Sequence, residues 1–228
     1  MAHPPDNQSG RYVRTAGLLV LGIFSCQPLW AHVIVGELEK MSGTHAALVY
    51  LGFGYQHILP LGFDHILFVL SLFLLSPRLK PVLWQATAFT IAHSVTLGLA
   101  MYHVIKPPSN IVEPLIALSI LYVALENIFS PRLKASRIGV VFLFGLVHGL
   151  GFAGALGKLG LPQNAYLISL VMFNLGVELG QITVILTAYF LLARPFGQKP
   201  YYRTRVVIPL SILIAVIAAF WTVQRIFF

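Results

Sequence analysis

The residues of this chain that could do chemistry are ionisable side chains placed inside apolar runs. Asp64 and His65 begin an apolar run that continues to Leu75, and the lone histidines His93 and His148 interrupt two further runs. An ionisable group inside hydrocarbon costs free energy, so each of these residues indicates a functional site. Imidazole and carboxylate groups bind divalent metals, and the pattern therefore predicts that these side chains face each other across helices and handle a metal ion.

Two other apolar stretches each carry one acid, Glu126 and Glu178. Asn127 follows the first acid, while Asn174 and Gln181 lie four residues before and three residues after the second. In a helix this spacing places Asn174, Glu178 and Gln181 in one polar stripe, which should face other helices rather than lipid. Neutral imidazole with carboxylate and amide oxygens suits nickel, cobalt, zinc or iron, and the order of affinities does not choose among them.

Less specific roles are open for several of these residues. A histidine in a membrane can simply hydrogen-bond a neighbouring helix. Glu126 can pair with Arg132 or extend to the inner interface. The glycines around and after His148 indicate close helix packing rather than a ligand loop. They are Gly145, Gly149, Gly151, Gly154 and Gly157.

The composition predicts an all-α, polytopic membrane protein. The 228 residues are 57% hydrophobic and 10% charged, with a mean hydropathy of +0.83, whereas soluble domains carry about 25% charged residues. The net charge is +8, but the basic residues fall between apolar runs, which indicates membrane topology rather than nucleic-acid binding. A single cysteine, Cys26, excludes an intramolecular disulfide and a thiolate metal cage.

Three regions are expected along the chain. Residues 1–31 resemble a signal peptide, with Arg11 and Arg14 before a short apolar stretch and a cleavage position at Ala31. The alternative is an uncleaved anchor. Residues 32–60 are mixed in character and predict an external segment that dips into the interface, and residues 61–228 predict a domain of six transmembrane helices.

The first predicted span is short for a hydrocarbon core of about 30 Å, so residues before Pro60 are expected to complete the crossing as a broken or re-entrant piece. Nine basic residues fall in the loops of one face and four on the other, which places both ends of the mature chain outside. The predicted spans are 61–76, 82–104, 111–129, 138–158, 165–193 and 206–227.

This topology assigns depths to the candidate ligands. His93 and His148 lie about ten residues, roughly 15 Å, from the inner ends of their spans, which is near the bilayer midplane. Glu178 is near the middle of its span, the Asp64-His65 pair is toward the outside and Glu126 is toward the inside. Ligands at three depths are what a stepwise path would require.

The second and fourth spans align without gaps over residues 89–94 and 144–149, which end on His93-Ser94 and His148-Gly149. Each is followed by a span with one acid, and both pairs run in the same direction. The alignment predicts a parallel two-helix repeat, an arrangement found in transporters with the site at the repeat interface. The alternative is chance similarity between apolar helices.

The ordered motifs around Asp64-His65-Ile66, Ala92-His93-Ser94-Val95 and Val147-His148-Gly149 resemble the HupE/UreJ family of membrane proteins over about residues 31–190. The first two also resemble signatures of nickel/cobalt permeases. The resemblance implies a multi-helix permease for nickel or a related divalent metal, linked to hydrogenase or urease maturation, with His57 as a further ligand upstream of Asp64. Two departures from the nickel-linked members make the chain resemble a divergent branch of the family. Six residues, 58–63, separate His57 from Asp64, where those members have a spacing of five. Phe144-Gly145 stands where those members carry an extra histidine.

The resulting hypothesis is a permease of the bacterial inner membrane that moves a divalent transition metal inward, and not an enzyme. His57, Asp64 and His65 would capture the ion. The ligands expected deeper in the membrane are His93, His148, Glu178 and Glu126, and the supporting polar residues are Ser94, Asn127, Asn174 and Gln181.

The metal is expected as substrate, nickel or cobalt with zinc also fitting, and no firmly bound cofactor is expected. The expected partners are the lipid bilayer and a second copy or other membrane subunits, with no nucleic acid. Two alternatives stay open: an intramembrane metalloenzyme that activates water at the same cluster, and a non-catalytic membrane subunit or assembly factor.

Overall fold

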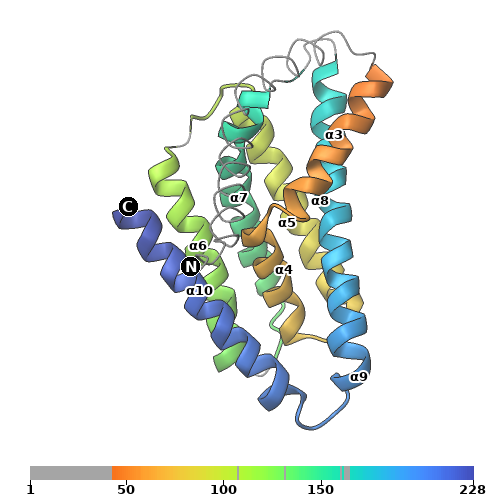
Figure 1. Cartoon of the computed structure of the whole chain (residues 1–228), viewed down its shortest axis with the longest axis vertical. Helices are drawn as coiled ribbons and strands as arrows, with labels where there is room; N and C mark the ends of the chain where they lie inside the picture. Colours follow the sequence, from red (N-terminus) through yellow and green to blue (C-terminus); the bar gives the residue numbers. More distant parts are fainter. Residues whose placement is uncertain (1–42, 107, 131, 160, 162–164) are drawn as a thin grey trace, which may run out of the picture.

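The computed structural model describes residues 43–228 except 107, 131, 160 and 162–164. Within these ranges the ordered elements are all helices, so the expected all-α membrane fold is confirmed. The predicted signal peptide, residues 1–31, lies outside the described residues. The helices form an elongated bundle (Figure 1).

The long helices run antiparallel or parallel to one common direction (Figure 1). We call the end at which α5 and α7 finish the outer end, and the end at which they begin the inner end, after the predicted orientation. The helices are α3 (Gly43–Ile58), α4 (Phe63–Leu75), α5 (Leu79–Met101), α6 (Ser109–Phe129), α7 (Arg137–Leu159), α8 (Tyr166–Ala188), its π-helical continuation η2 (Tyr189–Ala193), α9 (Arg194–Phe196), η3 (Arg203–Val207) and α10 (Ile208–Phe227).

Five of the described helical segments are long and apolar enough to cross a membrane, and α3 with α4 makes a sixth if this bent pair is one span. The two helices meet at an angle of 69° across residues 59–62, where Pro60 has no amide hydrogen to donate. A side chain at Gly62 would collide with the carbonyl of His57, so the tight turn needs glycine there.

The break explains why the first predicted span is short. Helix α3 has 16 residues and α4 has 13, which correspond to about 24 Å and 20 Å. The chain therefore reaches the middle of the bundle in α3 and completes its way to the inner end in α4. The described part of the expected external segment, α3, is a helix that packs along α8 (Figure 1).

Glycines allow two helix pairs to approach closely. Helix α3 meets α8 where Gly54 lies against the carbonyl of Phe173 and Gly176 lies against the carbonyl of Leu51. Helix α5 meets α7 in the same way, because a Cβ at Gly145 would collide with the carbonyl of Phe89. Such small-residue contacts are typical of helix pairs in membranes.

The expected packing role is right for Gly145, Gly149 and Gly151, each of which faces atoms of a neighbouring helix. It is wrong for Gly154 and Gly157, where an added Cβ would meet nothing within 4 Å. These two line a cavity of about 590 Å³ at the outer end instead.

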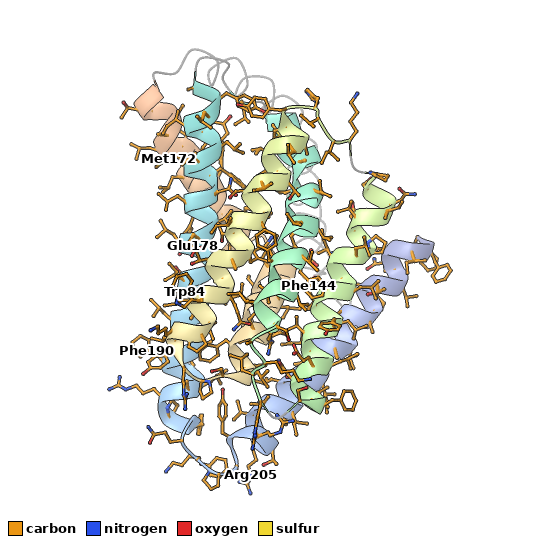
Figure 2. All side chains as sticks on the ribbon, turned by 180° about the vertical axis from the view of Figure 1, so that it is seen from behind. Trp84, Phe144, Met172, Glu178, Phe190 and Arg205 are labelled. Carbon is orange, nitrogen blue, oxygen red and sulfur yellow. The ribbon has the colours of Figure 1, made fainter. Side chains whose placement is uncertain are left out.

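Polarity is distributed as a bilayer requires. Trp84 and Phe190 are exposed on the outside of their helices (Figure 2), where lipid would cover them. His93 and Gln181 are completely buried. The interior thus holds polar side chains while large apolar side chains are exposed on the surface, so the chemistry lies inside the bundle.

Candidate metal site

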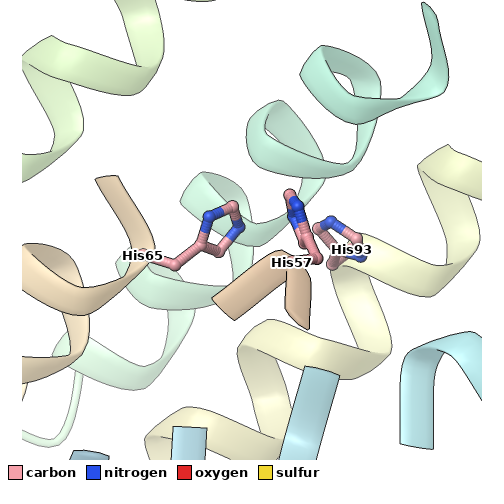
Figure 3. Close-up of side chains that lie close together, drawn as sticks. All are labelled: His57, His65 and His93. Atoms are coloured by element: carbon pink, nitrogen blue, oxygen red, sulfur yellow. The ribbon is translucent and has the colours of Figure 1, made fainter. Parts of the chain in front are cut away.

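Three histidine rings meet where α3 breaks. His57 is on the last turn of α3, His65 is on the first turn of α4 and His93 is in the middle of α5. One ring nitrogen of each lies within 4.8 Å of the other two, and the close-up shows the three rings side by side (Figure 3). His65 and His93 are buried, and His57 is half-buried.

A fourth ring, His148 of α7, joins this cluster. Its centroid is 4.9 Å from that of His65, and its side chain is buried. The close approach of α5 and α7 places it there, because Gly149 packs against the carbonyl of His93. Thr96 also donates a hydrogen bond of 2.7 Å to the carbonyl of Leu146. Three imidazoles that could share one ion, and a fourth ring beside them, therefore come from four helices.

The hydrogen bond of His93 determines which of its nitrogens is free. The amide nitrogen of Asn174 donates to the carbonyl of Leu170 at 2.9 Å, so its Oδ1 faces His93 Nδ1 at 3.1 Å. An oxygen acceptor requires Nδ1 to carry the proton, which leaves the lone pair on Nε2. That Nε2 is buried without a hydrogen-bond partner among the described residues.

His148 is arranged in the same way. The hydroxyl of Ser119 donates to the carbonyl of Ile116 at 2.7 Å, so its oxygen accepts from His148 Nε2 at 2.9 Å. The lone pair of His148 then lies on Nδ1, which has no partner within the described chain. Nε2 of His57 and of His65 are likewise buried and unpartnered. Outer hydrogen bonds that orient imidazoles in this way are typical of metal sites.

A cavity of about 510 Å³ adjoins the cluster, and its walls include His57, His65 and His148. Asp64 and Arg225 also line it. Both oxygens of the Asp64 carboxylate are 3.0 Å from Arg225 Nη2. Asp64 therefore lies beside the histidines as expected, but its carboxylate forms an ion pair with the guanidinium of Arg225.

The predicted depth is wrong for His65. His65 lies at the level of His93 and His148 rather than closer to the outside. The reason is the break in the chain, because α4 begins in the middle of the bundle and not at its surface.

Glu178 belongs to a polar contact between α8 and α5, one turn from Asn174 toward the inner end. Its Oε1 accepts a hydrogen bond of 2.7 Å from Thr87, and its Oε2 is buried without a partner among the described residues. Thr90 and Gln181 approach at 3.5 Å beside it. The predicted polar stripe does face another helix, and it extends from His93 toward the inner end.

Glu126 and Asn127 form a separate network. Glu126 Oε2 is 3.3 Å from Arg137 Nε, so its ionic partner is Arg137 and not Arg132, which was one of the alternatives. Asn127 donates to the carbonyl of Ser71 at 2.7 Å and accepts from Arg137 Nη2 at 3.2 Å. These bonds join α4, α6 and α7 near the inner end and do not bring either residue to the histidines.

Ser94 does not support the cluster, because its hydroxyl donates to the carbonyl of Thr90 in its own helix at 2.6 Å. Sequence reasoning missed Ser119 and Arg225. The repeat could have identified Ser119, which follows His93 by 26 residues as Asn174 follows His148 by 26. No spacing could have identified Arg225.

A family model described as HupE / UreJ protein matches residues 35–225. No curated protein and no solved structure matches the chain. The matched range contains the four histidines and almost all of the described helices.

Proposed function

This chain belongs to the HupE/UreJ family, and we propose that it is a multi-pass permease that carries a divalent transition-metal ion. The observation that supports this most is the meeting of three imidazoles, His57, His65 and His93, from three helices inside an apolar bundle, with the ring of His148 beside them. Within the described chain, one buried nitrogen of each of these four rings has no hydrogen-bond partner. Leaving such groups unsatisfied is costly, and a cation bound between His57, His65 and His93 would offset that cost.

The donor set supports a borderline metal over calcium or magnesium, because imidazole nitrogen is a poor ligand for those hard cations. Nickel and cobalt are the substrates that we propose first, since the family is generally associated with nickel/cobalt transport or metalloenzyme maturation. The metal is cargo rather than a resident cofactor, and the chain is not an enzyme. A transport site must release its ion, so a closed four-ligand cage would not suit it. His57 and His65 lie on the two halves of the bent pair α3 and α4, so a movement of one half against the other would separate them and release the ion.

The route that we propose begins at the cavity beside Asp64, passes the histidine cluster and continues along the contact of Thr87 and Glu178 toward the inner end. The membrane would be the bacterial inner membrane, with both ends of the mature chain outside. Inward movement of two charges across 100 mV is worth roughly 4.6 kcal/mol. Glu126 lies off this route, because Arg137 neutralises it.

The experiment is metal uptake into proteoliposomes containing the full chain, with nickel, cobalt, zinc, copper and iron compared. His65→Ala and His93→Ala should abolish saturable uptake while the proteins stay folded. His45→Ala is the matched control, because His45 is an exposed histidine at the start of α3 and its loss should change nothing.

The two alternatives predict different results in the same assay. Absence of uptake with tightly retained, stoichiometric metal would favour an intramembrane metalloenzyme. Absence of both uptake and metal binding would favour a structural subunit or assembly factor.

A further inference from the structure

The inner end of the bundle holds a cavity of about 760 Å³ that the metal route does not use. Three guanidinium groups line it, from Arg78, Arg132 and Arg194. They come from three separate parts of the chain, because Arg78 precedes α5, Arg132 lies between α6 and α7, and Arg194 begins α9. The guanidinium of Arg194 also lies over the ring of Phe190. The tendency of inner loops to be basic explains why positive charge lies on this side. It does not explain why three arginines gather around one cavity.

These three cations have no acidic counterpart in the cavity. Its described lining residues include no carboxylate. The acids elsewhere in the described chain are occupied or distant, since Asp64 pairs with Arg225 and Glu126 pairs with Arg137. Like charges around a concave surface raise the local positive potential, which favours binding of an anion.

The basic surface continues into a smaller neighbouring cavity of about 240 Å³, which Lys199 and Arg203 line. Both cavities share Leu75 and Pro77 in their walls. Arg203 is held in place, because its guanidinium donates to the carbonyl of Ile128 at 2.8 Å. The two hollows thus form one cationic region at the ends of the spans.

The shape and surroundings of this region favour a phosphate group on a lipid. Guanidinium groups match phosphate oxygens in pairs of hydrogen bonds. The cavity lies where helices end, which is the level of headgroups, and Phe190 and Leu191 are exposed on the adjoining turn of η2. An acyl chain could cover these apolar side chains, whereas a soluble anion could not.

We propose that the cavity between Arg78, Arg132 and Arg194 binds the phosphate headgroup of an anionic phospholipid of the inner leaflet. Pockets with basic side chains between helix ends on the cytoplasmic side bind such headgroups. The proposal rests on the orientation given under the proposed function, but it does not depend on metal transport.

The test is thermal unfolding of the purified full chain in neutral detergent, titrated with short-chain phosphatidylglycerol, phosphatidylcholine or inorganic phosphate. Phosphatidylglycerol should stabilise the wild type saturably. Its apparent Kd should rise roughly fivefold for each arginine replaced in Arg78→Gln, Arg132→Gln and Arg194→Gln and further in the triple variant. The single variants keep the test valid if the triple variant does not fold.

Arg205→Gln is the matched control. Arg205 is an exposed arginine at the same end, lies over the ring of Tyr201 and does not line the cavity (Figure 2). Equal phosphatidylglycerol binding by the wild type and the cavity variants would overturn the proposal. Full stabilisation by inorganic phosphate alone would also overturn it, because the ligand would then be a soluble anion.

Discussion

Arg225 and Asp64 are 161 positions apart, and Nη2 of Arg225 lies 3.0 Å from both oxygens of the Asp64 carboxylate. The same guanidinium donates to the carbonyl of Glu113 at 3.2 Å and lies over the ring of Trp221. The last turn of α10 is thereby joined to the first turn of α4, one residue from His65. A positive charge stands at the cavity through which the proposed cargo, also a cation, would reach the histidines.

Arg225→Gln should therefore favour metal capture. The change removes a like charge near the ion and frees the carboxylate of Asp64, so the KM for metal uptake should fall about threefold or more. Stability should fall by only about 1 kcal/mol or less, since both side chains are partly exposed. The measurement is initial uptake rate against metal concentration, with Arg225→Lys restoring the wild-type KM. An unchanged or higher KM in Arg225→Gln would contradict this role.

Asn174→Ala should weaken metal binding although Asn174 is not a ligand. Without the acceptor oxygen, His93 is free to rotate or to move its proton to Nε2, and such losses typically cost 10–100-fold in metal affinity, roughly. Titration of purified protein with nickel or cobalt measures the effect, and Asn174→Asp should restore much of it. Ser94→Ala is the control, because Ser94 bonds only its own helix and should bind metal normally.

Gly149→Ala should destabilise the protein and disturb the site together. The added Cβ would collide with the carbonyl of His93 and the hydroxyl of Thr96, and overpacking of this kind costs about 1–3 kcal/mol. Thermal unfolding and metal binding should both decline. Gly154→Ala is the control, since open space surrounds that position, and it should leave stability and metal binding unchanged. Equal losses of stability and metal binding in the two variants would refute a role for close packing at Gly149.

The cost of polar groups in lipid explains what the sequence could predict. It correctly marked His65, His93 and His148 as residues that lie inside the bundle, because that argument needs only the residue type and its apolar neighbours. A break before Pro60 was expected from the shortness of the apolar run, and Gly62 lies in the turn. His65 was nevertheless placed at the wrong depth, because the sequence marks the position of the break in the chain but not its position in the bundle. The 69° angle is likewise a property of the folded structure that the sequence pattern does not give.

The partners that side chains find on other helices were harder to predict from the sequence. Arg132 was one partner considered for Glu126, but the structure pairs Glu126 with Arg137, at the start of the next helix. The hydrogen bonds of two histidines fit the predicted repeat, although its two acids, Glu126 and Glu178, have unlike partners. His93 bonds Asn174 and His148 bonds Ser119, so each histidine uses the polar residue that lies 26 positions after the other. This exchange is what two parallel helix pairs related by a twofold axis would produce.

The two lone acids should respond differently to the same substitution, which separates a structural from a transporting carboxylate. Glu126→Gln leaves the buried guanidinium of Arg137 without its counter-charge and should destabilise the fold by about 3–5 kcal/mol. Glu126→Gln with Arg137→Met should recover most of that loss. Metal selectivity should stay unchanged in both proteins, because the ion pair does not touch the histidines.

Glu178→Gln should instead preserve the fold and reduce flux. Glu178 has a hydroxyl partner, Thr87, and no basic partner among the described residues, so the neutral amide leaves no opposite charge uncompensated. The histidine cluster stays complete and should bind metal with wild-type affinity. Removing the negative charge should raise the barrier for the cation as it passes Glu178. A rise of about 1.4 kcal/mol would lower uptake about tenfold. Binding by titration and uptake in proteoliposomes must be measured on the same preparation. Equal losses of binding and uptake would place Glu178 among the ligands of the cluster, and loss of neither would remove it from the route.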